Sequence, residues 1–327
     1  MDKDNIDIIV RNLSKSFQTV KAVNDISFEV KTGELFGFLG PNGAGKTTSI
    51  KMMTGLARPD SGSIITAGID CSKNPKAAQH LIGIVPDESN LYPELTGFEN
   101  LCFCASLYGI GKAEREQEAR NLLESFDLKE AANRKFGAYS KGMKRKLTIA
   151  AGIIHKPRVL FLDEPTTGID VASARALRTM IEELHKQGTT ILLTTHYIEE
   201  AQRLCDRIAF IVGGKIVAVD SVHNLLKHEE GKYFLQVSHK GRNPEIAEQL
   251  TARFAHMRIS FLQDSVFRLE SQEPINITPI VNFLEELGID VMEAKRILPS
   301  LEEVFVKITG LEADTMRKDQ EKKGGKK

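Results

Sequence analysis

The sequence contains no tryptophan and only four cysteines, and its 44 basic side chains balance its 44 acidic ones. Because nucleic-acid-binding surfaces need an excess of positive charge, this balance disfavours nucleic acid as a partner. No apolar run approaches the roughly 20 residues that a membrane-spanning helix needs, and the N-terminus is unlike a signal peptide. We therefore expect a cytoplasmic protein whose cysteines stay reduced, since disulfides are rare in that compartment.

What the sequence does contain is a phosphate-binding loop between an expected strand, residues 35–39, and an expected helix, residues 46–56. Glycines let backbone N–H groups turn towards phosphate oxygens, and the helix N-terminus adds its positive dipole end. A glycine-rich structural turn is the alternative, which the flanking strand and helix disfavour. The loop matches the pattern GxxxxGK[ST] and consists of Gly40, Pro41, Asn42, Gly43, Ala44, Gly45, Lys46, Thr47 and Thr48.

Two side chains of this loop have expected roles in phosphate chemistry. Lys46 is expected to reach the β- and γ-phosphates of a nucleoside triphosphate. The Thr47 hydroxyl is expected to ligate Mg²⁺ beside those phosphates. The loop therefore predicts a nucleotide site that works with a magnesium ion.

A second motif places two carboxylates after another expected buried strand, because Asp163 and Glu164 directly follow the apolar residues 159–162. In doubly wound sheets, ligands bind at the carboxyl ends of the strands. Since neighbouring strand residues point to opposite faces, we expect different roles for the two carboxylates. Asp163 is expected to hold Mg²⁺ through water, and Glu164 to polarise the attacking water. A carboxylate that caps the following helix is the alternative, which the upstream loop disfavours.

Two further side chains are candidates for the same site. His196 follows an expected buried strand at residues 189–195, so it can hydrogen-bond a γ-phosphate or orient the attacking water. Phe17 precedes the phosphate-binding loop and can offer a stacking platform to a purine ring. A lone histidine or aromatic is more often an ordinary core or surface residue, and that alternative stays open for both.

A cluster of basic residues marks the start of another expected helix. Ser140 is a good N-cap for a helix that extends to about residue 154, and four of residues 141–146 are basic. Such a helix start can bind an anion. A solvated basic helix end explains the same pattern equally well.

Alternating strand and helix patterns indicate an α/β fold with more than one part. Residues 1–228 are expected to form a nucleotide-binding domain, with an antiparallel β layer whose first strand, residues 6–13, lies at an edge. This domain is expected to contain a helical subdomain at about residues 95–155. Residues 229–310 follow the order β-α-β-β-α-β, which predicts a small ferredoxin-like α/β accessory module. Residues 311–327 are expected to be a charged, disordered tail.

In this order, the motifs resemble those of the ATP-binding subunit of an ABC transporter over about the first 220 residues. The phosphate-binding loop is similar to the Walker A motif, and residues 159–164 are similar to Walker B with its catalytic glutamate. Thr167–Asp170 resembles the D-loop, and His196 resembles the switch histidine. Phe17 stands where the family has its adenine-stacking aromatic. The resemblance implies a P-loop NTPase fold of the ABC cassette type and an ATPase that uses ATP and Mg²⁺.

The resemblance also implies roles that the residues alone do not suggest. Ser140 and Gly142 align with the family signature, which reads YSKGM here rather than LSGGQ and which closes over the ATP of the partner subunit. Asp87 stands where the family has a glutamine that touches Mg²⁺, so the implied metal ligands are Thr47, Asp87 and Asp163. Residues 298–305 resemble the exporter branch in which the ATPase and the permease are separate chains.

The implied partners are a transmembrane permease and a second cassette, either another copy of this chain or a paralogue. Such a dimer lies on the inner face of the cell membrane as a peripheral protein, and ATP-dependent dimerisation drives the permease. Two other functions stay open. One is an ABC ATPase that acts on the ribosome or nucleic acid, and the other is a P-loop phosphotransferase for a small molecule.

Overall fold

The computed structural model describes residues 6–227, 233–240, 246–263, 265–297 and 300–311. Its described residues form two units, one that extends to Val222 and resumes at Phe305, and a second that comprises His223–Val304. The predicted domain boundary at residues 228 and 229, and residues 312–327 of the predicted tail, lie outside the described residues. The two units differ from the predicted domains in one respect. The end of the last helix, from Phe305 onward, groups with the first unit and not with the accessory module.

A mainly parallel six-stranded sheet is the centre of the first unit, in the order β10-β9-β3-β8-β7-β6. All its strands are parallel except β10, which forms an antiparallel hairpin with β9. Every residue of β3, β7 and β8 is buried, as expected for strands covered on both faces. The strands are β3 (Leu35–Leu39), β6 (Ile82–Val85), β7 (Val159–Asp163), β8 (Thr190–Thr195), β9 (Arg207–Val212) and β10 (Lys215–Ser221).

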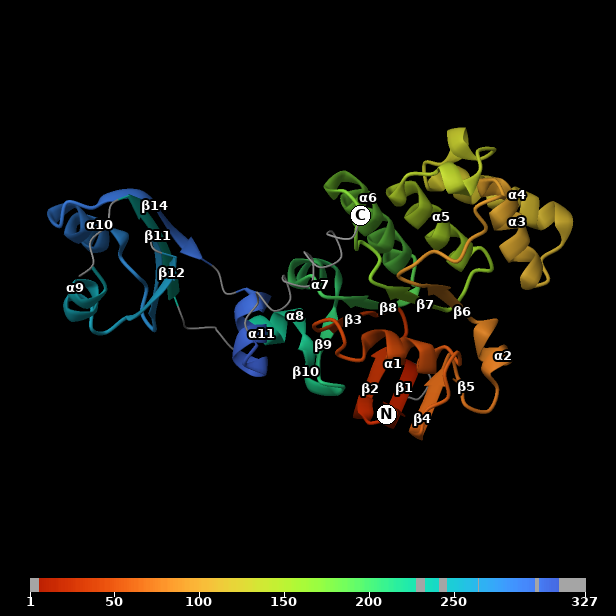
Figure 1. Cartoon of the computed structure of the whole chain (residues 1–327), viewed down its shortest axis with the longest axis horizontal. Coiled ribbons are helices and arrows are strands. Elements are labelled where there is room, and N and C mark those ends of the chain that lie inside the picture. The colour runs from red at the N-terminus through yellow and green to blue at the C-terminus, as the bar shows by residue number, and fades with distance from the viewer. Residues whose placement is uncertain (1–5, 228–232, 241–245, 264, 298–299, 312–327) are drawn as a thin grey trace. The chain divides into compact units, whose positions relative to one another are not determined.

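An antiparallel sheet in the order β2-β1-β4-β5 forms a second layer of this unit (Figure 1). The prediction of an edge strand at residues 6–13 is wrong, because β1 pairs with β2 on one side and β4 on the other. Phe28 of β2 stacks on Phe36 of β3 with ring centroids 5.4 Å apart, so one apolar core joins both sheets. The strands are β1 (Ile6–Phe17), β2 (Val20–Lys31), β4 (Ser61–Thr66) and β5 (Ile69–Asp70).

Three helix starts of the first unit follow the capping chemistry of the sequence. Thr96 and Glu99 form a reciprocal capping box at α3, and Ser140 and Asp170 cap α5 and α6 with their side-chain oxygens. Helices α3, α4 and α5 lie between β6 and β7 in the chain, where the helical subdomain is predicted. The helices are α1 (Lys46–Met53), α2 (Pro75–Gln79), α3 (Gly97–Leu107), α4 (Lys112–Ser125), α5 (Lys141–Ile153), α6 (Val171–Lys186) and α7 (Ile198–Leu204). Helix α8 (Val222–Lys227) begins at Val222, and its other residues belong to the second unit.

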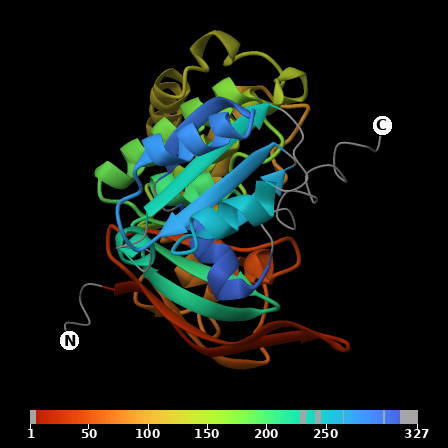
Figure 2. The same ribbon diagram turned by 90° about the vertical axis from the view of Figure 1, so that its left-hand side faces the viewer.

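The second unit contains a four-stranded antiparallel sheet in the order β12-β13-β11-β14 (Figure 2). Its elements follow the predicted β-α-β-β-α-β order, while the ferredoxin-like fold itself stays a prediction. Its core is apolar and includes Leu235, Leu250 and Leu269. The elements are β11 (Tyr233–Lys240), α9 (Ile246–Arg253), β12 (Arg258–Gln263), β13 (Val266–Ser271), α10 (Ile277–Glu286) and β14 (Asp290–Ile297).

The last described helix, α11 (Leu301–Thr309), contributes an aromatic side chain to the first unit. Phe305 is fully buried, and its ring packs edge-on against that of Phe210 in β9, with centroids 5.2 Å apart. In the part of the chain that the structure describes, no helix is both long enough and apolar enough to cross a membrane.

Candidate nucleotide site

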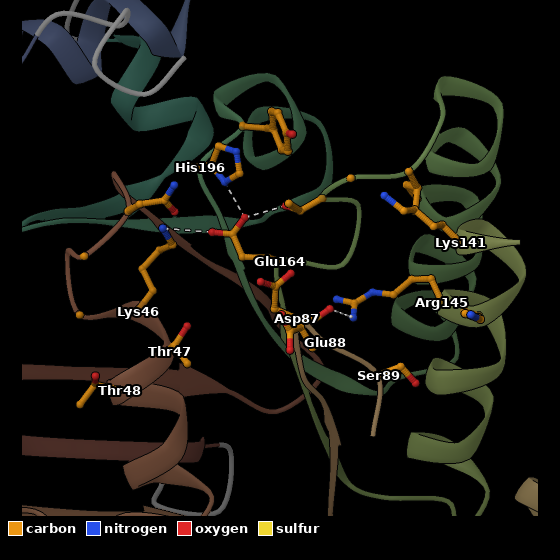
Figure 3. Close-up of a pocket in the computed structure, with 18 of the residues that line it drawn as sticks. Lys46, Thr47, Thr48, Asp87, Glu88, Ser89, Lys141, Arg145, Glu164 and His196 are labelled. Atoms are coloured by element: carbon orange, nitrogen blue, oxygen red, sulfur yellow. Dashed lines mark hydrogen bonds and ion pairs between the residues drawn. The ribbon is translucent and has the colours of Figure 1, made fainter. Parts of the chain in front are cut away.

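A cleft of about 900 Å³ opens at the carboxyl ends of β3, β6, β7 and β8. Its wall combines the phosphate-binding loop, the segments that follow β6, β7 and β8, and the first turns of α5 (Figure 3). The structure therefore brings together most of the predicted site. The predicted residues in this wall are Asn42, Gly43, Gly45, Lys46, Thr47, Thr48, Asp87, Glu164 and His196.

The shape of the phosphate-binding loop depends on Gly45. Its φ of 103° lies in the region that favours glycine, and a Cβ at this position would lie only 2.3 Å from the carbonyl oxygen of Ala22. Helix α1 begins at the next residue, and no side chain caps it. The first N–H groups of α1 therefore lack a side-chain acceptor, and they belong to residues of the cleft wall. Phosphate oxygens would satisfy these donors, so the loop fits a nucleotide.

Lys46 is buried, and its ammonium group lies at the centre of the site. Nζ donates to the carbonyl oxygens of Gly40 at 2.7 Å and Pro41 at 3.2 Å. The same atom lies 3.1 Å from Oε1 of Glu164 (Figure 3). Gly40 and Pro41, which do not line the cleft, thus contribute by orienting the lysine.

A backbone turn places the carboxylate of Glu164 near Lys46. Glu164 has a φ of 50°, which is uncommon for a residue with a side chain and is often found at active sites. Its N–H group donates to the Thr194 carbonyl oxygen at 3.1 Å, which fixes the turn to the end of β8. On the side-chain oxygen Oε2, Glu164 accepts from Thr167 Oγ1 at 2.9 Å and lies 2.5 Å from His196 Nδ1.

The surroundings of Glu164 keep its carboxyl group ionised. Burial raises its pKa, but the hydrogen bond with His196 and the positive charge of Lys46 outweigh this effect. Together they lower the pKa from the ordinary 4.5 to about 2. An ionised carboxylate can only accept hydrogen bonds, so the proton of His196 must lie on Nδ1. Glu164 therefore has the protonation state of a base at neutral pH.

The three predicted metal ligands do not all face the cleft. Thr47 and Asp87 line it, whereas Asp163 is buried and accepts from Thr194 Oγ1 at 2.5 Å. Asp163 and Glu164 thus have different surroundings because the chain turns at Glu164, not through the predicted alternation of a strand. Among the described residues, no three histidine, cysteine or acidic side chains form a metal cluster. The predicted set has a hydroxyl and two carboxylates, an oxygen donor set that suits Mg²⁺ and leaves positions for phosphate and water.

Besides Gly40, Pro41 and Ala44 of the phosphate-binding loop, three predicted nucleotide contacts lie outside this cleft wall. Phe17 is 53% exposed at the end of β1, and Lys15 Nζ lies 5.6 Å from its ring centre, so its stacking role stays a prediction. Ser140 is exposed and caps α5. Gly142 is buried, and a Cβ there would lie 2.3 Å from Ser173 Oγ of α6, so this glycine permits close packing of the two helices.

Sequence reasoning missed the roles of two buried charged side chains, Arg145, which lines the cleft, and Glu200, which lies beside it. Arg145 appears in the sequence only as one of the basic residues near Ser140, and its contacts depend on loops far away in the chain. Glu200 accepts hydrogen bonds from Thr166 Oγ1 and Thr195 Oγ1, both at 2.7 Å. It thereby joins the segment after Glu164 to the residue before His196. Its only sequence signal was its position four residues after that histidine.

Comparison with known proteins agrees with this geometry. A family described as ABC transporter matches residues 23–167, which include the phosphate-binding loop and both carboxylates. The linearmycin resistance ATP-binding protein of Bacillus subtilis is 35% identical over 302 residues, or 91% of this chain and 97% of the relative. The chain belongs to the ATP-binding subunits of ABC transporters. It is therefore an ATP-binding protein and an ATPase.

Other members of the ABC family match the chain over similar lengths. The doxorubicin resistance ATP-binding protein of Mycobacterium tuberculosis is 36% identical over 94% of this chain and 95% of its own length. The Nod factor export ATP-binding protein I of Rhizobium etli is 35% identical over 93% of each chain.

Solved structures confirm the predicted ABC cassette fold. An ATP-binding subunit of an ABC transporter aligns with a TM-score of 0.62 and 32% identity, over 68% of this chain and 92% of the other. A dimeric ATP-binding cassette in a post-hydrolysis state with ADP and Pi has the same TM-score of 0.62 at 23% identity, over 66% of this chain and 98% of the other. The second likeness shows the fold alone.

Proposed function

We propose that this ABC ATPase powers export through a separate transmembrane permease. The observation that carries the proposal is the convergence of Lys46, Glu164 and His196 at one cleft, in a chain whose relatives over nearly full length are named for drug resistance and Nod factor export. The cargo would be chosen by the permease. In this account the chain lies at the inner face of the cell membrane as a peripheral cytoplasmic subunit.

The proposed chemistry starts from the competition for Lys46. A bound triphosphate carries more negative charge than Glu164 and would attract the ammonium group of Lys46. The ion pair between Lys46 and Glu164 would therefore weaken. The pKa of Glu164 would then rise towards its ordinary value, and Glu164 would become a stronger base for the attacking water. With Nδ1 donating to Glu164, His196 can donate to a phosphate oxygen only when Nε2 also carries a proton.

Mg²⁺ would be held by the Thr47 hydroxyl with Asp87, and by Asp163 through water. When bound, the ion would neutralise charge on the phosphates. Asp87 is shorter than the glutamine that the family has at this position and carries a negative charge. We expect the activity to require a divalent cation, with half-maximal activity at a higher Mg²⁺ concentration in an Asp87→Ala variant.

Two cassettes would be needed for a complete site. Ser140 is exposed and lies outside the cleft of its own chain, which suits a signature that closes over the ATP of a partner subunit, while Gly142 lets α5 pack against α6 beside it. The exposed end of α5 at Ser140 is free to meet another chain. The partner would be a second copy of this chain or a paralogous cassette.

A cluster of exposed apolar side chains next to the Asp87 loop is suited to contact the permease. Tyr92 is 52% exposed, and its ring packs edge-on against that of Phe103, with centroids 5.1 Å apart. Leu107, one helical turn further along α3, is 65% exposed. Only a short segment joins Tyr92 to Asp87 of the cleft wall. A partner bound at Tyr92 could therefore act on the nucleotide site through this segment. We propose this surface as the point of force transfer.

ATP-dependent dimerisation is the first test of this function. A Glu164→Gln variant should bind Mg·ATP and accumulate as a dimer, because the base is lost while Lys46 and the loop remain. Light scattering after size exclusion, with and without Mg·ATP, measures the mass. Glu199→Gln, an exposed neighbour on α7, is the matched control and should behave as wild type. A Glu164→Gln variant that stays monomeric with ATP and still turns it over would contradict the proposal.

The permease is the second test. Affinity purification of the tagged wild-type chain from detergent-solubilised membranes should recover an integral membrane protein. A variant in which Tyr92 and Phe103 are both replaced by Ser should no longer recover this membrane protein, and it should retain basal ATP hydrolysis. Recovery of ribosomes or nucleic acid in place of a membrane protein would favour the other class of ABC ATPase.

A further inference from the structure

A single buried arginine joins the three parts of the chain that meet beside the nucleotide site. Arg145 of α5 is only 6% exposed, and its guanidinium donates to backbone carbonyl oxygens on two loops. Nη1 donates to Asp87 at 3.1 Å and also to Pro86, on the loop after β6. At the end of β7, Nη2 donates to the carbonyl oxygen of Asp163 at 2.7 Å, and on the loop that follows, Nε donates to that of Pro165 at 2.8 Å.

These four contacts are of a kind that only arginine can make. A guanidinium presents five N–H donors in a rigid plane, whereas a lysine has three donors at one point. Backbone carbonyl oxygens accept from the N–H groups of Arg145, and the negative charges of nearby Asp87, Asp163 and Glu164 offset part of the cost of its burial. A buried cation that is not hydrogen-bonded in this way would be strongly unfavourable. The arrangement therefore fixes the two loops relative to α5.

The positions of the acceptors connect Arg145 to the chemistry. Asp163 and Pro165 flank Glu164, so the guanidinium holds the backbone on both sides of the residue with the φ of 50°. The Asp87 carbonyl belongs to a residue whose side chain lines the cleft. Arg145 itself lies five positions after Ser140, on the same helix.

We propose that Arg145 is a positioning residue for ATP hydrolysis, which holds the backbone at Asp87 and on both sides of Glu164 against α5. It acts through these residues and not as a catalytic group. A displacement of α5 would thus reach the base and the Asp87 loop together. This role rests on the proposed function of Glu164 as the base, and the experiment below separates the two.

The test compares Arg145→Lys and Arg145→Gln with the wild-type chain. Misplacing a catalytic group by about 1 Å can lower a rate about 100-fold, so kcat should fall about 10-fold in Arg145→Lys and about 100-fold in Arg145→Gln. The KM for Mg·ATP should stay within about twofold, because Lys46 and the phosphate-binding loop do not depend on Arg145. Lys146→Gln is the matched control, since Lys146 lies next on α5 and is 3.7 Å from the exposed carboxylate of Asp127.

Amide hydrogen exchange provides a readout that does not require activity. In Arg145→Lys, exchange should become faster at residues 86–89 and 163–167, and Lys146→Gln should leave both segments unchanged. A folded Arg145→Lys variant with wild-type kcat overturns the proposal, as does one whose KM rises while kcat is unchanged. If Arg145→Gln does not fold, Arg145→Lys decides the matter. A wild-type chain without ATPase activity would refute the proposed function, and unchanged exchange in Arg145→Lys would then still refute the positioning role.

Discussion

The two units of the chain differ in what they bury. The first unit buries charged side chains beside its cleft, among them Lys46, Arg145 and Glu164, each less than a tenth exposed. In the described part of the second unit, the buried side chains are apolar, as at Leu235 and Leu269, except for His239 and Ser271, and no acidic, lysine or arginine side chain is among them. Burying charge is unfavourable unless it is paired or hydrogen-bonded, so a fold retains buried charges where they serve a purpose. The contrast therefore assigns the chemistry to the first unit.

Removing the buried ammonium group should have the largest effect. Lys46→Ala should lower ATP turnover on the order of 10²–10³-fold, the loss that follows removal of one charge-stabilising donor from an active site. Phosphate release with saturating Mg·ATP measures it. Lys51→Ala, an exposed position on the same helix, is the control and should stay within about twofold of wild type. Wild-type turnover in Lys46→Ala would place the chemistry elsewhere.

Creating a similar cavity in the core of each unit should distinguish an effect on stability from an effect on activity. Leu160→Ala in β7 and Leu269→Ala in β13 each remove a fully buried side chain, and each should cost about 2–5 kcal/mol of unfolding free energy. Leu160→Ala should also lower kcat, because Glu164 directly follows β7, while Leu269→Ala should leave it within about twofold. Thermal unfolding and ATP turnover below both midpoints give the two readouts. An equal loss of kcat in the folded Leu269→Ala variant would remove the contrast between the units.

The depressed pKa of Glu164 should give the protein a stability that is lost in acid. Because the folded pKa of about 2 lies below the ordinary 4.5, the contribution is full above pH 4.5 and disappears as the pH falls towards 2. Its size is on the order of 3 kcal/mol. Urea unfolding across this range should therefore show a smaller acid loss in Glu164→Gln. Parallel pH profiles for the two proteins would mean that Glu164 has no such contribution.

Glu200 should show the opposite pH dependence, with a smaller effect. Burial raises its pKa, while the Thr166 and Thr195 hydroxyls lower it only in part. Because its pKa is higher in the folded protein than the ordinary 4.5, Glu200 lowers the stability of the fold as the pH rises from 4.5 through the folded value. The unfolding free energy of Glu200→Gln should therefore increase relative to that of wild type as the pH rises. Glu200→Ala, which leaves two hydroxyls without their acceptor, should cost about 1–2 kcal/mol. Urea midpoints from pH 4 to pH 8 test this, and a constant difference between Glu200→Gln and wild type would contradict it.

Local patterns were enough to predict the elements around the nucleotide site. The apolar run before Asp163, the glycines before Lys46 and the N-cap at Ser140 each act over a few residues, and each element formed as expected. The edge strand at residues 6–13 was wrong because pairing with β4 depends on a strand about 50 residues further along the chain. The alternation of one strand cannot show how many neighbours it has.

The contacts within the site were harder to predict than its members. Arg145 reads in the sequence as one of several basic residues, and only the fold brings it to carbonyl oxygens 58 and 59 positions earlier in the chain. The ion pair between Lys46 and Glu164 also depends on the turn at Glu164, which no residue type in that segment requires. Motif spacing thus predicts which groups are present, and tertiary packing decides how they act on one another.

In the proposed mechanism, Glu164, next to Lys46 and His196, activates water against the ATP that this cleft binds. Single-turnover phosphate release with enzyme in excess over Mg·ATP tests it most directly, because this measurement does not depend on product release. Glu164→Gln should lower this rate on the order of 10²–10⁴-fold while ATP still binds. A rate within about twofold of wild type would contradict it.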